Sequence, residues 1–353
     1  MSDKKLLIIT GCSGRIGVAA INRFVNEYQI IGFDIYQPPM NHPNLSWMNV
    51  DLSSDQSVRN ALISVKEKHG NQVASVIHLA AYYNFTGEVT DKYETITVKG
   101  TERMIRGMQD FQCEQFIFSS TMLVHKPCEP SEKINEEWPL EGTWDYPKSK
   151  IATEAVMHEY RGSIPIVMLR IAGVYDDHCH SIPISNQIQR IYEKQFASIV
   201  FPGDLTHGAS FLHMNDLVDC IELCVQKRAQ LPKECVLLVG EDQTLSYDTL
   251  QKIISKEISG KEMMTLRIPK LGAKVGAWMQ NHLPFMPKTF IKPWMIDIAD
   301  ANYTLDISKA RDVLGWVPKN NLRDKLPLMI QDLKANPTAW YKEQKLEMPK
   351  GMK

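Results

Sequence analysis

The stretch LLIITGCSGRIG, residues 6–17, decides the fold of this chain. Residues 6–9 are a continuous apolar run, which is typical of a strand covered on both faces. Gly11, Gly14 and Gly17 follow this run and open a predicted helix over 16–28. In such a strand–turn–helix context the glycines allow a tight turn, a close backbone approach to phosphates and close packing of the helix on the strand.

The start of this helix also offers free N–H groups and the positive end of the helix dipole to an anion. The stretch therefore predicts a dinucleotide-binding turn. Its candidate cofactor-binding residues are Gly11, Cys12, Ser13, Gly14, Arg15, Ile16 and Gly17.

Strands and helices alternate regularly downstream of the turn. This order predicts an α/β fold, a Rossmann-type doubly wound parallel sheet. Residues 1–174 are expected to form the dinucleotide-binding domain, with 211–240 returning to it, and 175–353 mainly a smaller C-terminal substrate lobe. The predicted strands are 30–34, 46–50, 76–80, 115–119 and 164–171, and the predicted helices are 54–69, 91–111 and one that starts near Tyr146.

Composition bounds the possible partners. The chain has 353 residues, of which 44% are hydrophobic and 23% charged, as in ordinary globular proteins. A formal net charge of -1 gives no reason to expect a nucleic-acid partner or an acidic membrane surface. No apolar stretch approaches the ~20 residues of an integral membrane segment. Amphipathic attachment of residues 272–298 to a membrane stays open, although their prolines break any long helix.

The seven cysteines are odd in number and contain no C-x-x-C pair. Free thiols in a reducing compartment are the expected state, which favours a cytoplasmic location. The same scattered spacing predicts no metal site.

Two acids are candidates for the adenosine half of the cofactor. Asp34 ends the second predicted strand near the ~20-residue offset at which a carboxylate receives ribose hydroxyls. Its charge repels a 2′-phosphate, so NAD is expected rather than NADP, although the cation of Arg15 weakens this argument. Asp51 is expected to accept from the adenine amino group. A helix N-cap is the alternative role for Asp51, although Ser53 or Ser54 fits that role better.

Tyr146 and Lys150 lie one turn apart on the same face of a predicted helix. A free tyrosine has a pKa near 10, and a neighbouring ammonium group favours its ionised form. Lys150 can also hold the nicotinamide ribose, and Thr121 ends the fifth strand, where its hydroxyl can orient a substrate oxygen. Behind a dinucleotide turn, this pair predicts hydride transfer at a carbon that bears oxygen.

Further motifs run along almost the whole chain. They are Asp51-Leu52, His78-Leu79-Ala80-Ala81, Phe118-Ser119-Ser120-Thr121, Leu169-Arg170, Val174-Tyr175, Phe211-x-His213-x-x-Asp216-Leu217-Val218, Asp306-x-Ser308-Lys309-Ala310 and Leu314-Gly315-Trp316-x-Pro318.

With these motifs the chain resembles the extended short-chain dehydrogenases/reductases, a family of epimerases, dehydratases and hydroxysteroid dehydrogenases. The resemblance implies that Tyr146 is the general acid/base, with Lys150 as its partner and Thr121 at the catalytic Ser/Thr position. It also implies a homodimer formed through a four-helix bundle to which the helix of Tyr146 contributes. Further cofactor-binding positions that it implies are Leu52, Leu79, Ala80, Ala81 and Ile171.

The chain departs from the family where substrates are chosen. Dehydratases carry Asp-Glu after the catalytic threonine, but this chain has Met122 and Leu123. Sugar-nucleotide enzymes commonly place an arginine at the position of Ala209 and an asparagine at that of Gly173. A nucleoside diphosphate needs charged, bidentate partners, so these departures argue against such substrates.

Apolar and aromatic side chains stand near the predicted site instead, among them the substrate candidates Tyr82, Tyr83 and Met122. We therefore expect an NAD-dependent oxidoreductase that interconverts a secondary alcohol and a ketone on a fairly apolar small molecule. A sugar epimerase with recycled NAD and a non-catalytic NAD-sensing module are the alternatives. For the aromatic residues of the smaller lobe, a role in its core is the alternative to a substrate contact. Other aromatic or apolar residues in these regions are Phe85, Trp138, Trp144, Trp278, Phe285, Met286, Phe290 and Trp294.

Overall fold

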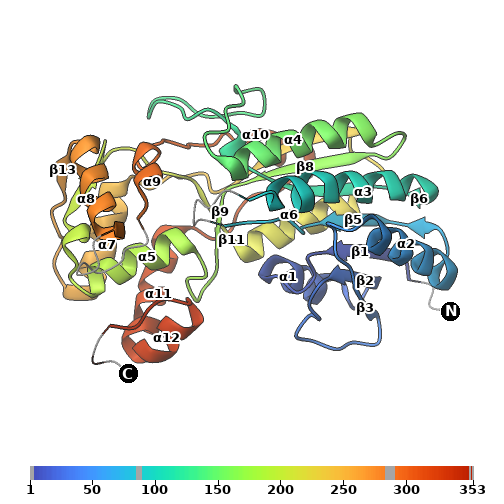
Figure 1. The fold of residues 1–353 in the computed structure, drawn as a ribbon, viewed down its shortest axis with the longest axis horizontal. Coiled ribbons are helices and arrows are strands. Elements are labelled where there is room, and N and C mark those ends of the chain that lie inside the picture. The colour runs from blue at the N-terminus through green and yellow to red at the C-terminus, as the bar shows by residue number, and fades with distance from the viewer. Residues whose placement is uncertain (1–3, 85–89, 283–290, 350, 352–353) are drawn as a thin grey trace.

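Parallel strands form the centre of the molecule. The computed structural model describes residues 4–84, 90–282, 291–349 and 351. Within them the main sheet has seven strands in the order β12-β8-β7-β5-β1-β2-β3 (Figure 1). Each neighbouring pair is parallel. The chain starts at β1, builds outward through β2 and β3, and then continues on the other side from β5. This arrangement confirms the predicted doubly wound sheet and sets a crevice at the ends of β1 and β5.

The bounds of the elements of this sheet and its helices follow the predicted alternation. They are β1 Leu6–Thr10, α1 Arg15–Phe24, β2 Gln29–Asp34, β3 Leu45–Asn49, α2 Asp55–His69, β5 Ser75–His78, α3 Lys99–Gly107, β7 Phe116–Thr121, α4 Asp145–Tyr160, β8 Ile166–Ile171, α6 Met214–Gln226 and β12 Glu234–Val239. The two-residue strands β4 Gln72–Val73 and β6 Gln112–Cys113 pair beside them.

Both faces of the sheet are covered by helices. Successive side chains of a strand point to opposite faces. On β1, Leu7 and Ile9 therefore join the core cluster that contains buried residues of α1 and α6. Leu6 and Ile8 join the cluster on the other face, under α2, α3 and α4. Continuous apolar strands of this kind are the sequence signature of a sheet buried on both sides.

The smaller lobe lies on the left of Figure 1 and has a core of its own between α5, α7, α11 and α12. The remaining elements are β9 Gly173–Tyr175, α5 Ile182–Tyr192, β10 Val200–Pro202, β11 Phe211–His213, α7 Tyr247–Ser259, β13 Leu266–Ile268, α8 Lys270–His282, α9 Pro293–Asp297, α10 Ser308–Leu314, α11 Leu322–Ala335 and α12 Pro337–Glu343.

Two late segments pack on the sheet domain and not on the smaller lobe. Strand β12 pairs with β8 over six residues and forms an edge of the main sheet. Trp316, which follows α10, is only 1% exposed, and its Nε1 donates a hydrogen bond to the Asp216 carbonyl on α6 at 2.9 Å. The division at residue 174 remains a prediction.

One predicted helix, over 91–111, differs from the structure in its first half. Tyr93–Val98 forms a π-helix that passes directly into α3, and a 3-10 turn, Met108–Asp110, follows α3. The π-helix contains β-branched Thr95, Ile96 and Thr97, which favour a regular α-helix less than unbranched residues do. The Thr97 hydroxyl also accepts a hydrogen bond from the Tyr82 N–H at 2.9 Å, which ties this segment to the end of β5.

Within the described ranges, no helix has the length and apolar character that would take it across a lipid bilayer. The seven cysteines are free thiols.

Candidate active site

The glycine turn leaves no room for side chains at two of its positions. Gly11 has φ +70°, and a Cβ atom there would lie 2.8 Å from the Ala80 N atom. A Cβ atom on Gly17 would lie 2.2 Å from the Gly11 carbonyl oxygen. The backbone of the turn is held by the Gly11 N–H, which donates to the Phe33 carbonyl at 2.9 Å. The turn is therefore fixed between β1, β2 and the residues after β5.

The start of α1 has the donors that a pyrophosphate needs. Its N-cap is Gly14, which carries no side chain to cover the helix end. The N–H groups of Arg15, Ile16 and Gly17 in the first turn have no acceptor within the helix, as in any helix start. The buried Cys12 side chain points away from this end, because a Cβ atom on Gly32 would lie 2.7 Å from its Sγ. The turn thus fits a dinucleotide, with Cys12 contributing backbone only.

Asp34 faces the turn from the end of β2. Its Oδ2 atom accepts hydrogen bonds from the Ser13 N–H at 3.0 Å and the Ser13 hydroxyl at 2.8 Å. Its Oδ1 atom accepts from the Tyr36 N–H at 3.2 Å. These bonds orient the carboxylate beside the predicted cofactor site, while Arg15 is exposed. This geometry is compatible with the expected hydrogen bonds to ribose hydroxyls.

Asp51 is not the cap of the following helix. The N-cap of α2 is Ser54, whose hydroxyl accepts from the Ser57 N–H at 3.3 Å. Asp51 instead accepts from the N–H and the hydroxyl of Ser53, at 2.8 and 2.7 Å. It is exposed, so its other oxygen is accessible for the predicted contact with adenine.

We expect Asp34→Ala to raise the ratio of NADP to NAD affinity by at least about tenfold, because like-charge repulsion against a 2′-phosphate costs more than ~1.4 kcal/mol. Titration of both cofactors by calorimetry measures the ratio. Asp34→Asn is the matched control, since it removes the charge but keeps an acceptor for Ser13, and it should shift the ratio in the same direction. A wild type that binds NADP more tightly than NAD would contradict this role of Asp34.

The structure brings the three predicted catalytic residues together. Tyr146 lies in the first turn of α4, Lys150 lies one turn later, and Thr121 ends β7. The side chain of Thr121 lies close enough to the phenol of Tyr146 to affect the pKa of that phenol. The Lys150 Nζ atom donates to the Ser119 carbonyl at 2.6 Å and lies 5.8 Å from the centre of the Tyr146 ring. The hydroxyl, the phenol and the amine therefore converge at the end of β7.

Burial dominates the proton affinities of this pair. It raises the pKa of Tyr146 to about 12, and the nearby Thr121 side chain opposes this rise. It lowers the pKa of Lys150 to about 7, and the nearby charge of Glu154 opposes this fall. The expected lowering of the phenol pKa by Lys150 is thus not seen in the protein by itself. The reason is that the amine donates to Ser119 and is itself destabilised as an ammonium ion by burial.

Beneath Lys150 lies a buried ion pair that the sequence analysis missed. Arg170 Nη2 and Nε donate to the two carboxylate oxygens of Glu154 at 2.7 and 3.1 Å. Ser120 Oγ donates to the same carboxylate at 2.5 Å, and Arg170 Nη1 lies 3.1 Å from His125 Nε2. Burial, together with Arg170, lowers the pKa of His125 to about 4. One sequence signal was available, because Glu154 follows Lys150 by one helical turn.

We expect Glu154→Gln to lower the free energy of unfolding by about 3 kcal/mol, because it leaves the buried Arg170 without its carboxylate partner. Urea denaturation followed by circular dichroism measures the loss. Glu159→Gln on the exposed side of the same helix is the control and should change stability by less than about 0.5 kcal/mol. Equal stability of the two variants would show that the pair contributes nothing at this position.

Aromatic rings surround the phenol. Tyr83 meets the Tyr146 ring edge-on at 4.7 Å between centroids, and Trp144 lies 5.4 Å from it. Trp294 of α9 packs on Trp144 at 5.1 Å. Sequence reasoning could place Trp294 only in the smaller lobe, since 148 residues separate it from Tyr146. The structure makes it part of the surroundings of the predicted site.

The other two substrate candidates lie differently. Tyr82 packs on Tyr93 at 4.9 Å, and its hydroxyl accepts from Asn84 Nδ2 at 3.1 Å. Met122 is only 4% exposed and belongs to the core cluster, so it has little surface to offer a substrate. Trp138 donates from Nε1 to the Lys126 carbonyl at 2.9 Å. Phe85, Phe285, Met286 and Phe290 lie outside the described residues.

The cofactor positions implied by the family resemblance cluster at the strand ends. Ala80 donates from its N–H to the Thr10 hydroxyl at 3.2 Å, and Leu79 and Ala81 flank it, partly buried. Ile171 lies opposite Thr121 in the register of β7 and β8. Leu52 packs at Gly100, where a Cβ atom would lie 3.0 Å from the Leu52 Cβ.

The two positions at which sugar-nucleotide enzymes hold the diphosphate offer no polar side chain here. A Cβ atom on Gly173 would lie 2.9 Å from the ring of Phe211, so an asparagine does not fit without a shift of that ring. Ala209 packs against the sheet core. In the part of the chain that the structure describes, no cluster of three or more His, Cys, Asp or Glu residues is arranged to hold a metal ion.

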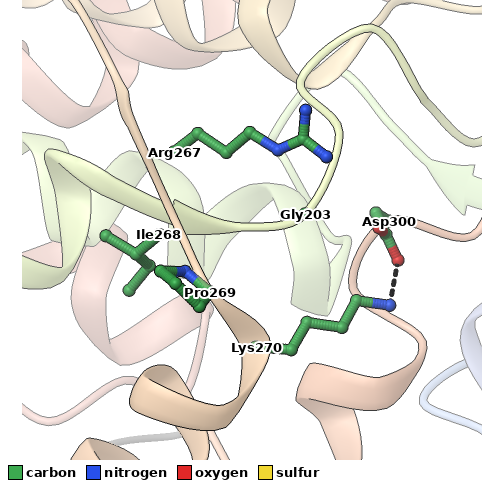
Figure 2. Close-up of a pocket in the computed structure, with 6 residues that line it drawn as sticks. All are labelled: Gly203, Arg267, Ile268, Pro269, Lys270 and Asp300. Carbon is green, nitrogen blue, oxygen red and sulfur yellow. Dashed lines mark ion pairs between the residues drawn. The ribbon is translucent and has the colours of Figure 1, made fainter.

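A separate pocket of about 450 Å³ lies in the smaller lobe (Figure 2). None of the predicted catalytic or cofactor-binding residues lines it, so the convergence of polar groups at Tyr146, and not this cavity, defines the candidate active site. The pocket is lined by Gly203, Arg267, Ile268, Pro269, Lys270 and Asp300.

The sequence profile of the NAD dependent epimerase/dehydratase family matches residues 7–240 of this chain. A protein of Bacillus subtilis described as an uncharacterised UDP-glucose epimerase is 23% identical over 333 residues, which cover 91% of this chain and 95% of the relative.

Two solved structures share the fold over nearly the whole chain. UDP-glucuronic acid 4-epimerase from Bacillus cereus, in complex with UDP-glucuronic acid and NAD, has a TM-score of 0.68 at 18% identity, covering 94% of this chain and 99% of its own. dTDP-glucose 4,6-dehydratase from Bacillus anthracis, in complex with NAD, has a TM-score of 0.70 at 18% identity, covering 96% and 99%. At such identities the likeness concerns the fold.

Proposed function

Since the chain belongs to the NAD-dependent epimerase/dehydratase family, we propose that it interconverts a secondary alcohol and a ketone on a fairly apolar substrate. The observation that carries this proposal is the aromatic surround of the phenol at the catalytic position. Tyr83 and Trp144 lie 4.7 and 5.4 Å from the Tyr146 ring, and Trp294 backs Trp144. Such walls favour a bulky substrate with little charge.

Membership of this family confirms the expectation that the cofactor is NAD. In our proposal the first turn of α1 holds the pyrophosphate, Asp34 receives the adenosine ribose hydroxyls and Lys150 holds the nicotinamide ribose. When bound, NAD supplies the hydride acceptor and, in its oxidised form, a positive charge that favours the ionised phenol.

The protein side chains would manage the proton. Tyr146 takes it from the substrate hydroxyl during oxidation and returns it during reduction. Thr121 holds the substrate oxygen through a hydrogen bond, since its side chain lies near the phenol at the end of β7. The rings around Tyr146 exclude water from the reacting carbon, which strengthens these polar contacts.

The proposal is tested with purified protein, NAD and a panel of alcohols that includes sterols and aromatic alcohols. NADH absorbance at steady state reports net oxidation, and we expect turnover with at least one apolar secondary alcohol. Activity confined to nucleotide sugars would overturn the substrate class.

A sugar epimerase that recycles its NAD is the second candidate. It is supported by the relatives, since both the Bacillus subtilis protein and the Bacillus cereus structure are described as epimerases of UDP sugars. Ala209 and Gly173 count against it, because a diphosphate needs charged partners. Micromolar binding of a UDP sugar, together with interconversion of two stereoisomers and no net NADH, would establish this function in place of the first.

A further inference from the structure

Helix α8 carries an apolar stripe on its surface. Leu271, Val275 and Trp278 are 75%, 53% and 52% exposed. Their spacing of four and three residues places them on one face of the helix. Globular proteins normally expose large apolar side chains singly, so a continuous row on one helix indicates a surface that something else covers. We call these three residues the α8 stripe.

The chain just before α8 extends the apolar surface. Met264 is 78% exposed, and Leu266 of β13 is 56% exposed. Figure 1 shows β13 and α8 side by side at the outer edge of the smaller lobe, away from the main sheet. An apolar surface at this edge is accessible to a partner much larger than a small molecule.

Basic residues outnumber acidic residues in the sequence around the stripe, although the chain as a whole is nearly neutral. Residues 261–300 contain six Lys and Arg and three Asp and Glu, whereas the whole chain has a formal net charge of -1. Arg267 is more exposed than buried, and its ion pair with Asp204 is long at 3.9 Å. Lys270 and Lys274 flank the stripe on one side and pair with Asp300 and Asp297, each at 2.5 Å. Figure 2 shows Arg267 and Lys270 on the same pocket.

The stripe is linked to the predicted active site by a short path. Helix α9 packs on α8, and Lys274 of α8 pairs with Asp297 of α9. At the other end of α9, Trp294 packs on Trp144, which lies beside Tyr146. The five-residue helix α9 therefore connects the α8 stripe to the aromatic rings around the phenol.

We propose that the α8 stripe docks this protein on the surface of an anionic lipid bilayer. An in-plane amphipathic helix binds lipid through Trp and Leu on one side and Lys and Arg beside them, and this is the composition and order found here. The basic residues beside the stripe, Arg267, Lys270 and Lys274, match anionic headgroups. Each basic group near such a surface adds to the electrostatic attraction. Docking is peripheral, as the stripe lies on the surface of a short helix. It would place the bilayer near the aromatic rings around Tyr146, but the docking itself does not depend on the proposed oxidoreduction.

Flotation of the full-length protein with vesicles tests the proposal without substrate or NAD. We expect co-flotation with mixed vesicles of phosphatidylcholine and phosphatidylglycerol, weaker binding to phosphatidylcholine alone, and weakening as salt is raised. Leu271→Asp should reduce binding to the mixed vesicles by at least about tenfold, and Arg267→Glu by at least about fivefold. Ile63→Asp is the matched control, because Ile63 is 49% exposed on α2 of the sheet domain, and it should bind like the wild type.

Brominated lipids locate the contact. They quench tryptophan that enters the bilayer, so Trp278→Phe should still float but lose most of the quenching. Equal flotation of the wild type and Leu271→Asp would overturn the proposal, and so would a wild type that stays with the soluble fraction. A wild type that does not float but forms a dimer which Leu271→Asp breaks, as seen by light scattering, would assign the stripe to a second copy of the chain. Each of these results is independent of whether an alcohol is oxidised.

Discussion

Tyr146→Phe is expected to lower kcat by about 10²–10⁴-fold, the usual contribution of a positioned acid/base, while NAD affinity changes by less than about threefold. The phenol hydroxyl faces Thr121 at the end of β7, whereas the ring packs against Tyr83 and Trp144. Phenylalanine keeps the ring and removes only the proton-transferring oxygen. NADH absorbance gives the rate, and calorimetric titration gives the affinity.

Tyr82→Phe is the matched control for this variant. The Tyr82 hydroxyl accepts from Asn84 and its ring packs on Tyr93, so the change should leave kcat within a few-fold of the wild type. If Tyr146→Phe retained nearly full activity, the phenol would not be the acid/base. If the Tyr146→Phe protein lost turnover but kept the biological effect of the wild type, the NAD-sensing interpretation would gain support.

Lys150→Met is expected to have opposite effects on activity and stability. Activity should fall by about 10²-fold or more, because the change removes both the charge near the phenol and the proposed contact with the nicotinamide ribose. The free energy of unfolding should rise at neutral pH by on the order of 2 kcal/mol, because the folded protein no longer buries an amine that burial drives toward deprotonation. Lys150→Arg keeps the charge but not the reach, so it should restore activity only in part.

The sign of the pH dependence follows from the direction of the shift. The pKa of Lys150 is about 7 in the folded protein, below its value of 10.5 in the unfolded chain. Between these two values the unfolded chain binds more protons, so the wild type gains stability as the pH rises. The advantage of Lys150→Met should therefore be largest below pH 7 and shrink toward pH 10.5. Urea denaturation across this range checks the trend, and a constant advantage would show that the amine does not titrate in the folded state.

Local patterns in the sequence predicted the sheet and its turn well. The glycines of residues 11–17 follow an apolar strand directly, and their geometry is set by neighbours in the chain and by Ala80 after β5. Tyr146 and Lys150 meet because they lie one turn apart on the same helix. In each case the contacts that matter are short in sequence or imposed by the handedness of the parallel sheet.

The rest depended on contacts between distant segments. Trp294 reaches Trp144 only through the fold of the smaller lobe, and Glu154 finds Arg170 across α4 and β8. Met122 is buried in the core because of how the chain turns after β7, which its position beside Thr121 does not reveal. The net charge of the whole chain, -1, also does not reveal the excess of Lys and Arg over Asp and Glu in residues 261–300. The homodimer and the cytoplasmic location remain predictions.

The late return of β12 and Trp316 to the sheet domain has a consequence for synthesis on the ribosome. Until β12 has been made, β8 is an open sheet edge, and until Trp316 emerges, one apolar face of α6 lacks its cover. From residue 174 to residue 316, translation takes roughly 7–28 s at the usual elongation rates of about 5–20 residues per second. Within this interval the nascent chain exposes first the β8 edge and then the apolar face of α6, and both features lead to aggregation. Production of this protein in a foreign host should therefore depend on chaperones that hold the nascent chain, and lower temperature should help when they are scarce.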